Sequence, residues 1–234
     1  MFNKLIKSYL INSLVDVHDL FITHPKLKNN LILKDKYRNK RLFILGSGNS
    51  ILNYDLKVLS NEYVMTKNSF HMHMDISDIN PNFHCVVPFY QTDKEYNIWV
   101  EYIDDIKLKM PNSIFFWGLN TKTLIDKHHE DIIEKSFYIR TKYDLLTLKY
   151  PKINISKTIM NIPTVLTQCL TVGIYMGFKE IYLLGCDMSY EKVTNKTHFY
   201  ANVEIAKQKA GNDSRKLWNK LVTDSYSIIN KTAN

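Results

Sequence analysis

An apolar run that ends in two glycines constrains the fold of this chain more than any other stretch. Residues 41–50 read RLFILGSGNS, so four apolar residues precede Gly46, Ser47, Gly48, Asn49 and Ser50. A short apolar run bounded by a glycine turn is typical of a strand buried in a parallel sheet. Glycines let the backbone approach a ligand, and amides near a helix N-terminus favour anions. We therefore predict a strand–loop–helix turn that binds an anionic ligand, with a turn that binds nothing as the alternative.

The spacing of these glycines excludes two well-known phosphate-binding loops. GSGNS matches neither the dinucleotide-binding pattern G-x-G-x-x-G nor the P-loop pattern G-x-x-x-x-G-K-[ST]. The loop is therefore a candidate binding site whose ligand the motif alone does not name.

Two further apolar runs follow and end in polar residues. We expect strands at 62–66 and 83–89, which lead to Asn68 and Gln91, and a short helix at 51–60. In an open parallel sheet, ligands bind outside the carboxyl ends of the strands. The loops after these strands are therefore expected to form one site with the glycine loop.

A second α/β unit lies at 163–190, with the sequence PTVLTQCLTVGIYMGFKEIYLLGCDMSY. Residues 164–176 are apolar nearly all round, which predicts a buried helix that ends at Gly177. Residues 181–184 predict a buried strand. Asp187 follows this strand at its carboxyl end, where functional residues concentrate.

The remaining segments are expected to complete an α/β fold. We expect helices at 94–110 and 203–230, a strand at 113–117, and an irregular lid or insertion within 141–160. No final strand is evident before Asn234, so we expect either a sheet that is one strand short or a truncated sequence.

The pair His128-His129, followed by Glu130 and Asp131, is a weak candidate for a metal site. Adjacent residues on a helix do not face one ligand, so a solvated polar face is the favoured interpretation.

The positive charge is concentrated near the start of the chain. Residues 1–41 hold nine Lys or Arg and three Asp, which accounts for six of the net charge of +8. Apolar spacing in 1–24 predicts an amphipathic helix, and 26–40 is expected to be a basic linker. This basic segment has three possible interpretations: it packs on the main domain, it contacts an anionic membrane surface, or it is a solvated arm. A transmembrane span is excluded by the many polar residues, and no signal-peptide cleavage site is evident.

Composition narrows the class of protein. Apolar residues make up 45% of the chain and charged residues 23%, as in soluble globular proteins. Cys85, Cys169 and Cys186 lie far apart in apolar runs, so buried free thiols are expected rather than a disulfide or metal site. This fits the cytoplasm. Nucleic-acid binding is disfavoured because the basic residues gather in a terminal arm, and homo-oligomerisation is left open.

Four motifs in order resemble a group of bacterial surface-polysaccharide proteins. They are ILGSGNSI with a following DL-x-x-L segment, KNSF, GFKEIYLLGCDMSY and THFY. The group is related to the family 42 bacterial sialyltransferases and, more loosely, to the motility-accessory and MptE-like diphosphokinase families. The resemblance covers roughly residues 40–230. It implies a Rossmann-like α/β fold with a mostly parallel sheet flanked by helices, in which 1–40 is an N-terminal helix and linker and 41–234 is a nucleotide-sugar transferase domain.

The resemblance also implies an activity. A glycosyltransferase would move a sugar, such as sialic acid or a related sugar, from a CMP-activated donor to a glycan or glycolipid of the bacterial surface, as in lipopolysaccharide or capsule biosynthesis. The reaction would need neither a metal nor a cofactor besides the nucleotide-sugar substrate, and the enzyme would be cytoplasmic or peripheral on the inner membrane. An MptE-like diphosphotransferase that uses ATP and Mg²⁺, and a non-catalytic nucleotide- or glycan-binding protein, are the alternatives.

Site residues are carried over by position. His198 matches the loop histidine proposed as the general base of the sialyltransferases, and Asp187 would orient it or hold a sugar hydroxyl. Asn49 stands where the related loops have proline, so the resemblance points to a reaction class rather than to one sugar. The implied donor-binding residues are Gly46, Ser47, Gly48, Asn49, Ser50, Asn68, Gln91, Thr164, Ser189 and Tyr190.

Overall fold

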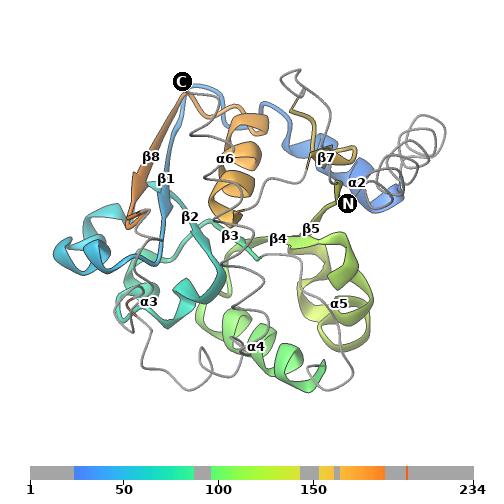
Figure 1. Cartoon of the computed structure of the whole chain (residues 1–234), viewed down its shortest axis with the longest axis horizontal. Helices are drawn as coiled ribbons and strands as arrows, with labels where there is room; N and C mark the ends of the chain where they lie inside the picture. Colours follow the sequence, from blue (N-terminus) through green and yellow to red (C-terminus); the bar gives the residue numbers. More distant parts are fainter. Residues whose placement is uncertain (1–23, 87–95, 143–152, 161–163, 188–198, 200–234) are drawn as a thin grey trace, which may run out of the picture.

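The computed structural model describes residues 24–86, 96–142, 153–160, 164–187 and 199. Within them, six strands form one parallel sheet in the order β5-β4-β3-β2-β1-β8 (Figure 1). The strands are β1 (Arg41–Leu45), β2 (Tyr63–Lys67), β3 (Phe83–Cys85), β4 (Ile114–Gly118), β5 (Ser136–Ile139) and β8 (Glu180–Leu184). The predicted Rossmann-like α/β fold is therefore confirmed.

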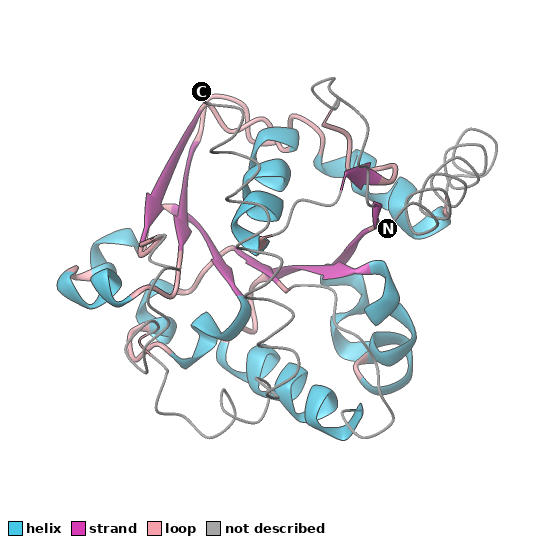
Figure 2. Ribbon diagram, viewed as in Figure 1, coloured by secondary structure: helices cyan, strands magenta, loops and turns pink. Residues whose placement is uncertain are grey.

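Helices cover both faces of this sheet (Figure 2). Helix α6 (Val165–Tyr175) lies on one face, and α3 (Ile76–Ile79), α4 (Tyr96–Lys109) and α5 (Lys122–His128) lie on the other. Short 3₁₀ helices connect these elements: η1 (Asn29–Leu33), η2 (Asn49–Asn53), η3 (Leu56–Leu59), η4 (Asn68–Met72), η5 (Leu119–Thr121) and η6 (Glu130–Lys135).

Successive side chains of a strand point to opposite faces of the sheet and pack in two separate hydrophobic layers. Leu42 and Ile44 pack on the α6 side with Val172, whereas Leu45 packs on the opposite side with Ile103 of α4. All five side chains are fully buried, and each contributes about 1.5–3 kcal/mol to folding through the hydrophobic effect. The apolar run in β1 is thus explained by burial on both faces of the sheet.

Helix α6 begins and ends at the residues that its sequence indicates. Thr164 is the N-cap, because its hydroxyl accepts a hydrogen bond from the Thr167 amide at 3.2 Å. Gly177 follows the helix with φ at +87°, a conformation that residues with a Cβ avoid.

The segment 51–60, expected to be one helix, contains parts of two 3₁₀ helices, so the predicted type of helix is wrong. Tyr54 and Asp55 have extended backbones between η2 and η3. The Asp55 carboxylate accepts a hydrogen bond from the Lys57 amide at 3.1 Å and so caps η3. A local side-chain contact therefore interrupts the helical pattern.

The segment expected to be a linker contains α2 (Pro25–Lys28) and η1, which are packed against the sheet domain. Leu27 and Leu33 are buried in the core. The buried side-chain amide of Asn30 donates hydrogen bonds to the carbonyls of Tyr138 (2.8 Å) and Ile155 (2.6 Å). This part of the basic segment is therefore structural.

Strand β8 differs from its prediction because it lies at an edge of the sheet. Among the described residues it pairs only with β1. Tyr182 and Leu183 remain 43% and 46% exposed, so the expectation of a buried strand is wrong. The Tyr182 ring stacks on Phe43 at 5.0 Å between centroids.

Several predictions fall outside the described residues, including the helix at 1–24 except for His24, the helix at 203–230 and most of the lid. The described ends of the lid, β6 (Thr141–Lys142) and β7 (Ile159–Met160), pair with each other in parallel. The other expected elements agree with the structure to within about two residues at their described ends, which is the usual uncertainty of such boundaries. Strand β5 had not been expected.

Candidate functional site

The order of the strands creates a topological switch point between β1 and β8. From β1 the sheet grows outward through β2, β3, β4 and β5, and the chain then returns to place β8 on the other side of β1. In open α/β sheets, ligands bind outside the carboxyl ends of the strands at such a point. The glycine loop after β1 and the loop after β8 both lie there.

The backbones of these two loops are interlocked. The Gly46 amide donates to the Leu184 carbonyl at 2.7 Å, and the Gly48 amide donates to the Gly185 carbonyl at 2.8 Å. A Cβ on Gly46 would lie 2.2 Å from the Gly185 oxygen, so a side chain cannot be accommodated without a shift of the backbone. The glycines therefore serve first to bring two strand ends into contact.

Asp187 reaches across from the second loop to the first. Its Oδ2 accepts a hydrogen bond from the Ser50 amide at 3.0 Å, and its Oδ1 accepts one from the Ser50 hydroxyl. A Cβ on Gly48 would lie 2.4 Å from Asp187 Oδ2. The position that an anionic ligand was expected to take at Ser50 is thus filled by the protein's own carboxylate.

Asn68 lies at the carboxyl end of β2 in a left-handed conformation, with φ at +48°. Its carbonyl oxygen lies 3.3 Å from Nδ1 of the buried His71 ring. The structure therefore places this predicted donor-binding residue at the same edge of the sheet as the glycine loop, two strands away from β8.

The THFY motif reaches the site through Phe199. The Phe199 amide donates to the carbonyl of the buried Ser47 at 3.2 Å. Its ring lies edge-on to Phe70 (5.4 Å) and to His73 (5.0 Å). Burial lowers the pKa of His73 below its usual value. The residue next to His198 thus contacts the glycine loop.

Comparisons of the chain with family models, with curated proteins and with solved structures find no significant match.

The N-terminus of α6 adds a partial positive charge at this edge of the sheet. Because α6 precedes the parallel strand β8, its N-terminus faces the carboxyl edge. The hydroxyl of Thr164 bonds to the Thr167 amide and hydroxyl, and Thr171 donates to the Thr167 carbonyl at 2.8 Å. No acidic residue lies in the first turn of α6.

Lys67 was missed by the sequence analysis. It ends β2 and stands in register with Cys85 of β3, which packs in the layer under α6. It is half-buried, and among the described residues no carboxylate lies within ion-pair distance of its ammonium. The signal in the sequence was a lysine directly before Asn68, at the end of an apolar strand.

Cys85 and Cys186 lie near Lys67. Interaction with Cys169 of α6, together with burial, holds the pKa of the Cys85 thiol well above its usual value. Burial raises the pKa of Cys186, and the Lys67 charge opposes this effect. All three are free thiols, as the sequence predicts, although Cys186 is only partly buried.

Four predicted site residues cannot be placed. Gln91, Ser189, Tyr190 and His198 lie outside the described residues. Their assignments, and the contact between Asp187 and His198, stay predictions.

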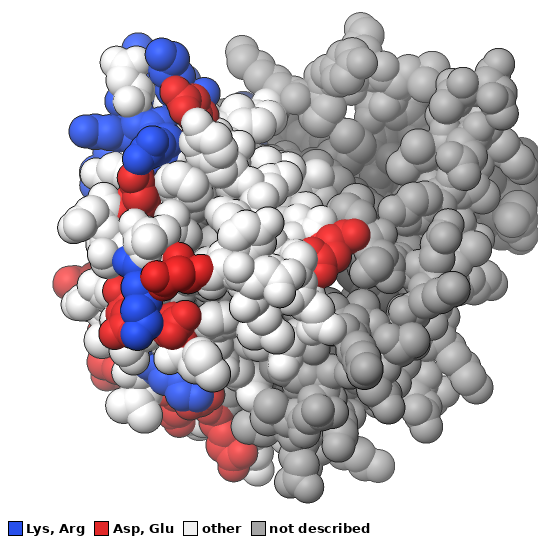
Figure 3. Space-filling model, turned by 90° about the vertical axis from the view of Figure 1, so that its left-hand side faces the viewer, with Lys and Arg blue, Asp and Glu red and all other residues white. Residues whose placement is uncertain are grey.

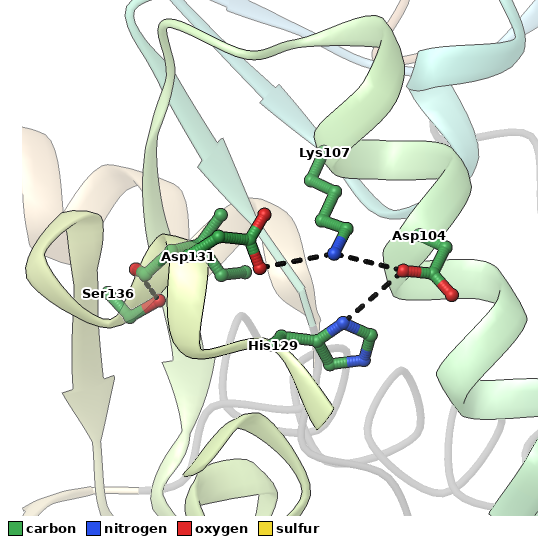
Figure 4. A network of polar contacts seen from close by, with 6 residues as sticks. Asp104, Lys107, His129, Asp131 and Ser136 are labelled. Carbon is green, nitrogen blue, oxygen red and sulfur yellow. Dashed lines mark hydrogen bonds and ion pairs between the residues drawn. The ribbon is translucent and has the colours of Figure 1, made fainter. Parts of the chain in front are cut away.

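A second polar cluster lies between α4 and η6 (Figure 4). Lys107 bridges Asp104 and Asp131 at 3.1 Å each, and Nδ1 of His129 lies 3.5 Å from Asp104 Oδ1. His129 is fully buried, so the expected solvated face is wrong for this residue, whereas His128 is exposed. Burial lowers the pKa of His129. No group of three His, Cys, Asp or Glu side chains suited to a metal ion occurs in the part of the chain that the structure describes.

Basic side chains gather away from the candidate site. Figure 3 shows the largest group of them at the end of the β1–β8 face where these strands begin, and further basic side chains beside acidic ones lower on this face. Lys34, Lys36 and Lys40, which precede β1, are exposed. None of the helices in the described residues has the length and apolar character that crossing a membrane requires. The membrane contact of the basic segment stays a prediction.

Proposed function

We propose that this chain is a glycosyltransferase that binds a nucleotide-sugar, with a CMP-activated donor favoured, in the crevice outside β1 and β8. The observation that carries the proposal is the meeting of the glycine loop and Asp187 at the topological switch point. Sites of this kind bind nucleotides in open α/β sheets. The sugar acceptor would be a glycan or glycolipid.

The position of Asp187 favours a hydroxyl-bearing part of the donor near Ser50. A carboxylate accepts hydrogen bonds and repels phosphate, and this one is held by the Ser50 amide. A ribose or sugar hydroxyl can donate to its remaining lone pairs. Asp187 therefore supports a hydroxyl-binding role.

The phosphate of the donor is best placed near Lys67 and the start of α6. A partly buried ammonium and a helix N-terminus both stabilise an anion, and their charges add at this edge of the sheet. When the acceptor oxygen attacks the anomeric carbon, the bond from that carbon to the phosphate oxygen breaks and CMP leaves. Lys67 would stabilise the charge that develops on the leaving phosphate.

His198 is the proposed general base. It would take the proton from the acceptor hydroxyl, a contribution of typically about 10²–10⁴-fold to the rate. The adjacent Phe199 contacts the glycine loop, which supports a position of His198 near the donor.

A thermal-shift screen with CMP, CDP, UDP, GDP and ATP, each with and without EDTA, tests the proposal. CMP at about 100 times its dissociation constant should stabilise the protein by about 2.7 kcal/mol. Stabilisation by CMP that survives EDTA supports the proposal. Metal-dependent stabilisation by ATP alone would favour diphosphotransfer instead, and no shift with any nucleotide would overturn nucleotide binding at this site.

Matched variants locate the bound nucleotide. Lys67→Met should weaken CMP binding about tenfold or more, because it removes a charged partner of the phosphate. Lys179→Met removes an exposed lysine next to the amino end of β8 and should leave the affinity unchanged. Equal affinities of the two variants would contradict the placement of the phosphate. Sugar transfer by His198→Ala, measured with a CMP-sugar donor, separates an enzyme from a non-catalytic binding protein, since turnover should fall while CMP binding persists.

A further inference from the structure

His71 is placed between two hydrogen-bond acceptors. Its ring is 1% exposed in η4, three residues after Asn68. Nδ1 lies 3.3 Å from the Asn68 carbonyl oxygen, and Nε2 lies 3.1 Å from Asp105 Oδ2. A carbonyl and an ionised carboxylate only accept hydrogen bonds. A ring that makes both bonds therefore carries a proton on each nitrogen and is positively charged.

The titratable groups around His71 include Asp105, Lys109, Tyr102 and His84. Asp105 of α4 also accepts a hydrogen bond from Lys109 at 3.0 Å, and the Tyr102 ring lies edge-on to His71 at 5.1 Å. The neighbouring His84 ring is 6.4 Å away and fully buried. Burial, followed by the charge of His71, holds the pKa of His84 well below its usual value, and a hydrogen bond with the Asn68 backbone opposes this effect.

The hydrogen bond from His71 is made to the carbonyl of a residue with an uncommon backbone conformation. Asn68 has φ at +48°, in the left-handed region that asparagine adopts more readily than most residues with a Cβ. Lys109, Asp105, His71 and the Asn68 carbonyl form a continuous chain of contacts from the surface of α4 to the carboxyl end of β2.

We propose that the imidazolium of His71, paired with Asp105, is a positioning group that fixes Asn68 for contact with the donor. The inference rests on the proposed function, in which Asn68 binds the nucleotide-sugar. His71 is buried and acts through Asn68, so it is a positioning residue rather than a catalytic one.

Nitrogen NMR of histidine-labelled protein tests the charge of His71 without any ligand. Both ring nitrogens of His71 should show the signature of bound protons at about pH 7.5, whereas a free imidazole is mostly neutral there. Asp105→Asn should convert the ring to its neutral form at this pH. A neutral His71 in the unaltered protein would overturn the inference.

CMP titrations then test the positioning. Asp105→Asn should weaken CMP binding by up to about tenfold at about pH 7.5. The neutral ring carries one proton and can place it on Nε2 toward the new amide oxygen, which leaves the Asn68 carbonyl without this donor. Lower pH favours the protonated ring in both proteins, so the difference in affinity should shrink as the pH falls from about 7.5 to about 5.5. A merely structural defect would weaken binding equally at both values. Asp104→Asn, on the same helix but directed at Lys107 and His129, is the matched control and should leave the affinity unchanged.

The outcomes separate this inference from the proposed function. If no nucleotide binds the unaltered protein, the proposed function fails, while the NMR result still decides the charge of His71. If CMP binds and Asp105→Asn leaves its affinity unchanged at both pH values, the positioning role fails and the proposed function stands.

Discussion

Gly48 leaves the space that the Asp187 carboxylate occupies. Its φ of −65° and ψ of 153° suit any residue, so the backbone does not require glycine here. An alanine would destabilise the protein because its Cβ would collide with the Asp187 carboxylate. We expect Gly48→Ala to displace Asp187 from Ser50 and to lower the free energy of unfolding by about 1–3 kcal/mol. Urea denaturation measures this loss.

A double-mutant cycle isolates the contact. In an Asp187→Ala background the obstacle is absent, so Gly48→Ala should then cost less than about 0.5 kcal/mol. Equal costs in the two backgrounds would show that the carboxylate is not the reason for the glycine.

At the scale of elements, Asn30 joins η1 to β5 and to the segment that contains Ile155. Asn30→Ala would leave two buried carbonyl groups without these donors, so the free energy of unfolding should fall by about 2–4 kcal/mol. Asn29→Ala changes an exposed neighbour in the same helix and should stay within about 0.5 kcal/mol. Chemical denaturation of both variants tests the prediction, and similar stabilities would mean that residues 25–33 act as a linker after all.

At the scale of the whole molecule, burial of neutral histidines makes stability depend on pH. Burial lowers the pKa values of His73, His84 and His129 below the usual 6.5. Below about pH 6.5 the unfolded chain binds protons at these rings that the folded protein excludes, so the free energy of unfolding falls as the pH drops. Above that pH these rings are neutral in both states, and the folded protein keeps the full stability that their burial allows.

His84→Gln isolates one of these contributions. The loss of stability between about pH 6.5 and pH 5 should become smaller by about 1–2 kcal/mol, since the variant has no proton to exclude at this position. His128→Gln changes an exposed ring and should leave the pH dependence as it is. The free energy of unfolding, measured from about pH 6.5 to pH 5, tests this prediction. If it falls equally with pH in His84→Gln and in the unaltered protein, the prediction is wrong.

Local patterns in the sequence were sufficient for most of the sheet and for the place of the candidate site. The apolar runs of β1, β2 and β4, the helical period of α4, and the Thr164 and Gly177 ends of α6 depend on neighbours in the chain. The same patterns predicted that the glycine loop and Asp187 each follow a strand at its carboxyl end, and in a parallel sheet these ends share one edge.

Only the tertiary structure decided which side chains meet. Asp187 contacts Ser50 across 137 positions of the sequence, and Asn30 reaches Ile155 across 125. The burial of His129 and the proximity of Cys85 and Cys186 to Lys67 were equally hidden. Periodicity and end signals report contacts between near neighbours, whereas these contacts depend on the order and register of strands, which the packing of the whole sheet determines.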